Sequence, residues 1–300
     1  MLSSYVKHSQ LKPNRVKYMK TPKLLQPLVD DGLIDNIIRR LKSGKEADVF
    51  IVRCGQEIRC AKVYKEAKKR TFKHAVHYQE GRKTRNSRNA RAISKNSKFG
   101  RQQQDIIWQQ TEIETLCLLT KLGVRVPQPD IYINGVLIME LITDKEGQAA
   151  PRLSDISLTP EQARKDYALI INYAVRMLCA GLVHGDLSAF NVLMNQYGPV
   201  IIDLPQVINA SANKNAKNIF ERDINNMSLY YSQYAPDISN NQYSKEIWEL
   251  YQQGRLTQES ILSGRFTENY TLTDISVILK EIQYVSNEHQ HQLLMRNQNK

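Results

Sequence analysis

One ten-residue segment, His-Gly-Asp-Leu-Ser-Ala-Phe-Asn-Val-Leu at 184–193, constrains the fold of this chain most strongly. It sets Asp186 and Asn191 five residues apart, between a stretch of helical character and an apolar strand. At this spacing a carboxylate can accept the proton of an attacking hydroxyl while the carboxamide holds a magnesium ion on nucleotide phosphates. A second carboxylate, Asp203, follows the apolar residues 200–202. The pattern predicts a phosphoryl-transfer site with Asn191 and Asp203 as metal ligands.

Such a site also requires a lysine on a hairpin strand, and Lys62 fits that role. The stretches 48–53 and 57–64 are rich in β-branched and aromatic residues and are joined by Cys54-Gly55-Gln56, which predicts a hairpin. The preceding Ser43-Gly44-Lys45-Glu46-Ala47 contains one glycine. Ordinary protein kinases use three glycines there so that the backbone can approach the phosphates, so this segment alone is a weak nucleotide signal.

Four segments together resemble the RIO family of atypical serine/threonine kinases, over about residues 32–251. They are Ser43-Gly44-Lys45-Glu46-Ala47, Ala61-Lys62-Val63-Tyr64-Lys65, Leu182-Val183-His184-Gly185-Asp186-Leu187-Ser188 and Ile201-Ile202-Asp203-Leu204-Pro205-Gln206. The chain is most similar to a bacterial form of the first RIO subfamily, with His-Gly-Asp in place of His-Arg-Asp. Residue 189 is alanine, where the family commonly carries an acidic residue.

The resemblance implies an ATP-dependent serine/threonine kinase that uses Mg²⁺. It implies catalytic roles for Lys62, Asp186 and Asp203, the last of which can also carry a phosphate transiently during ATP turnover. The nucleotide-binding residues that it implies are Ser43, Gly44, Lys45, Lys62, Glu112, Glu140 and Ile142. The protein substrate is not identified by these motifs.

The expected fold is α+β: a two-lobed, protein kinase-like fold with a small antiparallel β lobe, a mainly helical second lobe and no activation segment. A helix is predicted over 105–122, because Ile106, Trp108, Ile113, Leu116 and Leu119 recur at roughly helical spacing. It carries Glu112, which the family pattern selects over Glu114 as the partner of Lys62. The alternative is that either glutamate faces solvent.

Local signals define the other elements. Asn134-Gly135 within 131–138 predicts a type I′ hairpin, which leads to Glu140 and Ile142 at the position where kinases present main-chain groups to adenine. Thr159, Pro160 and Gln162 predict the start of a long helix that Gly181 ends. A further helix over 216–234 leaves no room for a long activation loop, and His184 is interpreted as a buried scaffold of the catalytic loop.

Charge divides the chain into a basic arm at 1–29, a small lobe at 30–142 with a flexible basic insert at 66–104, a second lobe at 143–286 and a polar tail at 287–300. Of the net charge of +12, residues 68–101 alone contribute twelve Lys or Arg against one acid, Glu80. This segregation favours an anionic partner such as RNA or a ribosomal subunit, and a solvated loop is the alternative.

Two other functions stay open. Small-molecule kinases of the aminoglycoside and choline kinase-like class also use His-Gly-Asp, although only about forty residues separate Ile142 from His184, where those enzymes insert substrate-holding helices. An RNA- or ribosome-binding scaffold with a nucleotide switch is the second. The four cysteines form no Cys-x-x-Cys pair, and the sequence shows neither a membrane-spanning stretch nor a signal pattern, so we expect a cytoplasmic protein that contacts no membrane.

Overall fold

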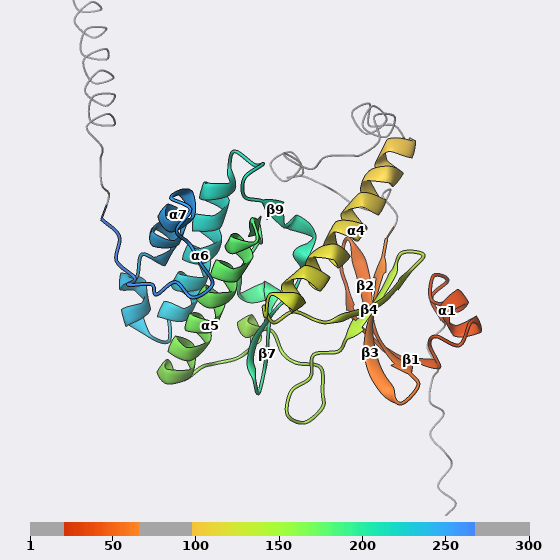
Figure 1. The fold of residues 1–300 in the computed structure, drawn as a ribbon. Coiled ribbons are helices and arrows are strands. Elements are labelled where there is room, and N and C mark those ends of the chain that lie inside the picture. Colours follow the sequence, from red (N-terminus) through yellow and green to blue (C-terminus); the bar gives the residue numbers. More distant parts are fainter. Residues whose placement is uncertain (1–20, 66–97, 268–300) are drawn as a thin grey trace, which may run out of the picture.

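The computed structural model describes residues 21–65 and 98–267. Its small lobe is a five-stranded sheet in the order β1-β2-β3-β5-β4, antiparallel throughout (Figure 1). The strands are β1 (Asn36–Ser43), β2 (Ala47–Cys54), β3 (Glu57–Tyr64), β4 (Pro129–Ile133) and β5 (Val136–Glu140). Both predicted hairpins are present.

The β4–β5 turn follows directly from its sequence. Asn134 and Gly135 have φ values of 49° and 80°. A type I′ turn needs positive φ at both central residues, and asparagine and glycine adopt it at least cost. The turn places Val136 to Glu140 beside β3, with Leu137 opposite Lys62. It thereby aligns the strand that ends at Glu140 with the strand that carries the predicted catalytic lysine.

The short helix α1 (Gln26–Asp30) packs against the small-lobe sheet (Figure 1). Leu25 and Leu28 are almost fully buried there against Phe50 and Ala61. The predicted boundary at residue 30 is therefore wrong, because these leucines belong to the core of the small lobe. A five-residue helix is too short to leave a recognisable period in the sequence. The rest of the predicted arm, residues 1–20, lies outside the described residues.

The helix α4 (Lys98–Lys121) lies between the sheet and the second lobe (Figure 1). It begins seven residues before the predicted helix, so the predicted insert ends too late. Residues 66–97, most of that insert, lie outside the described residues. Leu116 and Leu119 are buried as expected, whereas Ile106 is 39% exposed and lies off the buried face.

The second lobe is mainly helical. Its helices are α5 (Pro160–Cys179), α6 (Ala216–Ser232) and α7 (Tyr243–Gln252), and its strand pairs are β6 (Leu182–Val183) with β9 (Ile208–Asn209) and β7 (Val192–Asn195) with β8 (Gly198–Ile201). The short 3₁₀ helices are η2 (Leu153–Asp155), η3 (Ala189–Asn191), η4 (Leu204–Gln206) and η5 (Pro236–Asn240). As predicted, Thr159 caps α5 by accepting a hydrogen bond from the Gln162 N–H at 3.2 Å.

One apolar core extends across both lobes, in addition to the separate core of the small lobe that contains Leu25 and Leu28. Its buried side chains include Leu137 of β5, Leu119 of α4, Ile170 of α5 and Ile224 of α6. The fold is thus the predicted α+β, two-lobed arrangement. Only residues 204–215 separate Asp203 from α6, and they form η4 and β9, so this described segment contains no long activation loop.

Two further expectations concern the ends and the environment of the chain. Residues 268–300, which include the predicted polar tail 287–300, lie outside the described residues. Among the residues that the structure describes, none of the helices combines the length and apolar character of a membrane-spanning segment.

Candidate active site

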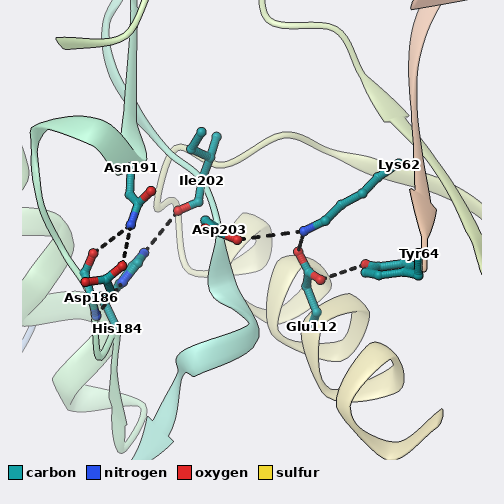
Figure 2. Close-up of polar contacts among 8 residues, drawn as sticks. All are labelled: Lys62, Tyr64, Glu112, His184, Asp186, Asn191, Ile202 and Asp203. Carbon is teal, nitrogen blue, oxygen red and sulfur yellow. Dashed lines mark hydrogen bonds and ion pairs between the residues drawn. The ribbon is translucent and has the colours of Figure 1, made fainter. Parts of the chain in front are cut away.

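Lys62 of β3 pairs with a glutamate of α4 across the small lobe. Its Nζ lies 2.5 Å from Oε1 of Glu112, and Tyr64 donates its hydroxyl to Oε2 of the same carboxylate at 2.6 Å (Figure 2). The side chains of Lys62 and Glu112 are 13% and 4% exposed. Glu114 is exposed instead. The structure therefore brings Glu112, the glutamate that the family pattern selects, to the lysine.

Tyr64 was not among the predicted site residues. It lies two residues after Lys62, and alternate residues of a strand share a face, so the strand pattern alone could have placed it there. Burial, followed by the charge of Glu112, raises the pKa of the Tyr64 hydroxyl, which keeps it a neutral donor. With Lys62 on one oxygen and Tyr64 on the other, both oxygens of Glu112 are held.

The ammonium of Lys62 also faces the second lobe. Its Nζ lies 3.9 Å from Oδ1 of Asp203, whose side chain is 46% exposed (Figure 2). Burial alone would lower the pKa of Lys62, but the carboxylates of Glu112 and Asp203 outweigh it and raise the pKa above its usual value. Lys62 is therefore a fixed cation between the lobes.

Asp186 and Asn191 meet in the catalytic loop. The Asn191 amide nitrogen donates to the Asp186 main-chain carbonyl at 2.8 Å and to its Oδ2 at 3.0 Å (Figure 2). The five-residue spacing closes through η3, because its single 3₁₀ turn brings the two ends of the loop together. The side-chain nitrogen of Asn191 thus orients Asp186, and the side-chain oxygen Oδ1 of Asn191 is left for another ligand.

His184 connects this loop to the strand that carries Asp203. The main-chain N–H of Asp186 donates to Nδ1 of His184 at 3.2 Å, so the ring proton is on Nε2 and is shared with the Ile202 carbonyl, also at 3.2 Å (Figure 2). His184 is 3% exposed. This agrees with its interpretation as a buried scaffold. Asp203, which follows Ile202, has φ 68° and ψ 61°, a left-handed conformation that turns the chain sharply after β8.

A second unpredicted residue, Asp223 of α6, forms hydrogen bonds with the same catalytic loop. Its Oδ2 accepts the Gly185 N–H at 2.7 Å, and Arg222 donates to its Oδ1 at 3.1 Å. Arg222 also donates to the Gly185 carbonyl. Burial raises the pKa of Asp223, and this is partly offset by the Arg222 guanidinium and by the hydrogen bond from the Gly185 N–H. The sequence signal that could have identified Asp223 is a carboxylate next to Ile224, on the apolar face of the predicted helix.

The turn between β1 and β2 holds the three predicted phosphate-contacting residues. The Ser43 hydroxyl donates to Asp48 Oδ1 at 2.5 Å, and the Gly44 N–H donates to the Ala47 carbonyl at 2.9 Å. Lys45 is exposed in the turn. Because the Ser43 hydroxyl is already engaged with Asp48, a phosphate contact from this residue would have to come from its main chain.

Glu140 and Ile142 lie where the chain passes from β5 to the second lobe. The Glu140 N–H donates to the Gln128 carbonyl at 2.8 Å, and the Ile142 carbonyl accepts from the Ala150 N–H at 2.9 Å. These bonds fix the backbone of the connection. They also restrict which main-chain groups can meet a ligand: a carbonyl at Glu140 and an N–H at Ile142.

The donor set suits a hard divalent cation. Asn191 has a carboxamide oxygen directed away from its bond to Asp186, and Asp203 has a half-exposed carboxylate. The Ile202 N–H donates to the main-chain carbonyl of Asn191 at 2.9 Å. The β7–β8 pair therefore brings Asn191 and Asp203 to the same end of the hairpin. Magnesium takes one or two protein oxygens and completes its shell with water and phosphate. These residues therefore fit a nucleotide-bound Mg²⁺.

A lysine–glutamate pair under a small β sheet, facing an aspartate–asparagine loop and a carboxylate after a β hairpin, defines a protein kinase-like phosphotransferase. Comparison with known proteins then narrows the class. The sequence profile of the RIO domain matches residues 48–244. The chain belongs to the RIO kinase family.

Three relatives show how far the similarity extends. RIO-type serine/threonine-protein kinase Rio1 of Haloferax volcanii is 30% identical over 213 residues, which cover 70% of this chain and 68% of that protein. Serine/threonine-protein kinase rio1 of Schizosaccharomyces pombe is 29% identical over 71% of this chain, and human RIO1 is 27% identical over 81%. The aligned part is 41% of each of these two longer proteins. The relatives are archaeal and eukaryotic, so a bacterial form of the subfamily stays a prediction.

Proposed function

We propose that this chain transfers the γ-phosphoryl group of ATP to serine or threonine hydroxyls of a protein. The observation that supports this most directly is the position of Lys62, 2.5 Å from Glu112 and 3.9 Å from Asp203. A cation held in this way can neutralise nucleotide phosphates between the lobes. Membership of the RIO family favours this reading over a small-molecule kinase.

In the proposed complex the adenine lies against the connection between the lobes. The Glu140 carbonyl accepts from the base, and the Ile142 N–H donates to it. Lys62 and the turn around Gly44 receive the phosphates. Asn191 and Asp203 would hold Mg²⁺, which when bound would supply positive charge to the phosphate oxygens.

Asp186 is the proposed general base. As the substrate hydroxyl oxygen bonds to the γ-phosphorus and the bond to the ADP oxygen breaks, the hydroxyl proton passes to the Asp186 carboxylate. Asn191 fixes that carboxylate through its 3.0 Å hydrogen bond to Oδ2. Lys62 stays charged throughout and stabilises the phosphate oxygens.

ATP hydrolysis through Asp203 is the second proposed activity. In the absence of a peptide, the Asp203 carboxylate attacks the γ-phosphorus, ADP leaves, and water then hydrolyses the acyl phosphate. Its 46% exposure and its 3.9 Å distance to Lys62 support access of the phosphoryl group to this oxygen. A carboxylate that also served as a metal ligand would be a weaker nucleophile, so this step would be slower than transfer to a positioned hydroxyl.

We further propose an RNA or ribosomal partner for the basic segment 68–101, on the strength of its charge alone. If about six of these cations met phosphates of single-stranded RNA, log affinity against log salt would have a slope of about −4. A flat salt response would return the segment to the solvated-loop alternative. This contact would also suit a scaffold role in which the nucleotide sets the conformation.

The direct test uses γ-labelled ATP, with and without protein or ribosomal-subunit substrates, on the wild-type chain and on three variants. Lys62→Ala and Asp203→Ala should abolish transfer, whereas Asp186→Asn should bind ATP but lose about 10² to 10⁴ in rate. Near-normal turnover by a folded Asp186→Asn would exclude the base assignment. Label at residues 201–206 that is released by hydroxylamine would support the acyl phosphate, and label only on serine or threonine would exclude it.

A further inference from the structure

The turn between β1 and β2 is held by a basic side chain that the proposed mechanism does not use. Lys65 Nζ donates to the Gly44 carbonyl at 2.6 Å and to Ser43 Oγ at 3.3 Å. It also pairs with Asp48 at 3.0 Å. The Lys65 main-chain N–H donates to the Glu46 carbonyl at 2.8 Å. This one residue, directly after β3, contacts both limbs of the turn.

The turn itself is tight and contains one glycine. Ser43 and Asp48 are opposed in the β1–β2 ladder and share a hydrogen bond of 2.5 Å. A Cβ atom at Gly44 would lie 3.2 Å from the Ala47 carbonyl, closer than ordinary contact. A three-glycine loop relies on its flexibility to approach phosphates. Here side chains fix the shape of the turn.

The charge of Asp48 gives Lys65 a second effect. Burial would raise the pKa of this carboxyl, but hydrogen bonds from Ser43 and Lys65 outweigh it and lower the pKa below its usual value. Asp48 is therefore a carboxylate at neutral pH, at the base of a turn proposed to face phosphates. Without Lys65 this negative charge would repel the nucleotide.

We propose that Lys65 is a positioning residue that braces the β1–β2 turn for the nucleotide phosphates and neutralises Asp48, without touching the nucleotide. The inference rests on the nucleotide site proposed above. Its consequence is selective: losing Lys65 weakens ligands in proportion to their phosphates and leaves the adenosine part of the site unchanged.

The test measures the affinity of the full chain for adenosine, ADP and ATP with Mg²⁺. Lys65→Met should weaken ATP binding by about fivefold or more, the size of a coupling of about 1 kcal/mol, and ADP binding by less, with adenosine unchanged. Lys145→Met is the matched control, since Lys145 is 78% exposed in a different loop, and it should bind all three like the wild type.

Removing the carboxylate separates neutralisation of Asp48 from direct contact between Lys65 and the nucleotide. The double variant Asp48→Asn/Lys65→Met should recover part of the lost ATP affinity, because no uncompensated charge then faces the phosphates. Absence of any recovery would overturn the proposal in favour of a direct contact between Lys65 and the nucleotide. An equal loss for adenosine would overturn it as well, since Lys65 would then support the whole lobe.

Hydrogen exchange of the nucleotide-free protein tests the brace independently of binding. The Gly44 amide, which donates to Ala47, should exchange faster in Lys65→Met than in the wild type or in Lys145→Met. Unchanged protection would overturn the brace. If the wild type binds no adenine nucleotide while the Gly44 amide responds as expected, the proposed function fails and the bracing of the turn stands.

Discussion

Replacing Asp223 by asparagine tests how the catalytic loop is held. The wild-type carboxylate accepts the Gly185 N–H on one oxygen and the Arg222 guanidinium on the other. An asparagine of the same size has one acceptor oxygen, so one of these donors must face its NH₂ group. A hydrogen bond to a charged group contributes about 1.5–3 kcal/mol, and burial of the carboxylate offsets part of that. We expect the free energy of unfolding to fall by about 1.5 kcal/mol in Asp223→Asn.

The functional loss should exceed the loss of stability. Gly185 precedes Asp186, so a displaced Gly185 N–H moves the proposed base, and a misplacement of about 1 Å can cost about 10²-fold in rate. Asp223→Asn should therefore lower kcat more than it raises KM for ATP, because the lysine–glutamate pair lies in the other lobe. Urea unfolding and steady-state phosphotransfer measure the two quantities.

A surface aspartate provides the control. Asp237 also accepts hydrogen bonds from an arginine, Arg164, but its side chain is 56% exposed. Asp237→Asn should leave both stability and kcat near wild-type values, since exposed pairs contribute little. If Asp223→Asn behaves like Asp237→Asn, the anchoring role of Asp223 is wrong.

The sign of the pH dependence gives a further check. Burial raises the pKa of Asp223 above 3.8, so the folded state holds this proton more tightly than the unfolded state. Wild-type stability then falls as the pH rises from 3.8 through the raised pKa, and the variant lacks this dependence. The stability deficit of Asp223→Asn should therefore be larger in acid than at neutral pH, and a deficit that grows with pH would contradict the assignment.

Three other outcomes are expected. Tyr64→Phe leaves one oxygen of Glu112 without its donor and should destabilise the protein by about 1–3 kcal/mol in urea unfolding, with a lower kcat; unchanged unfolding would refute this role. Alkylation at pH 8 should label the exposed Cys117 well before Cys60, whose pKa burial raises to about 12, as peptide mass analysis would show. The folded pKa of Asp48 lies below 3.8, so its contribution to stability is present above 3.8 and is lost as the pH falls from 3.8 through the lowered folded pKa. The free energy of unfolding of Asp48→Asn should therefore fall less in acid than that of the wild type.

The elements that local sequence specifies were predictable. The Asn134-Gly135 turn needs only two residues with positive φ, and the start of α5 needs only Thr159 as its cap. The motif spacing also located Asp186 and Asn191, since both lie within one short loop. In each case the interactions that form the feature connect residues close in sequence.

The unpredicted features depend on contacts between distant segments. Tyr64 and Glu112 are 48 residues apart, and Gly185 and Asp223 are 38 apart. The strand period can place Tyr64 on the same face as Lys62, but it does not identify Glu112 as the partner of Tyr64, and no local pattern connects Asp223 with Gly185. The burial of Leu25 by the small lobe likewise depends on strands that come later in the chain. These are tertiary contacts, and a period or a cap cannot reveal them.

The shared apolar core has a consequence for the rate at which nucleotide leaves. Leu119 of α4 and Leu137 of β5 are packed in the same cluster as the helices of the second lobe. Swinging the lobes apart would expose this continuous apolar surface to water, which raises the barrier to opening. Escape of ADP would then depend on smaller local motions, and we expect long dwell times of bound nucleotide, with product release rather than chemistry limiting turnover.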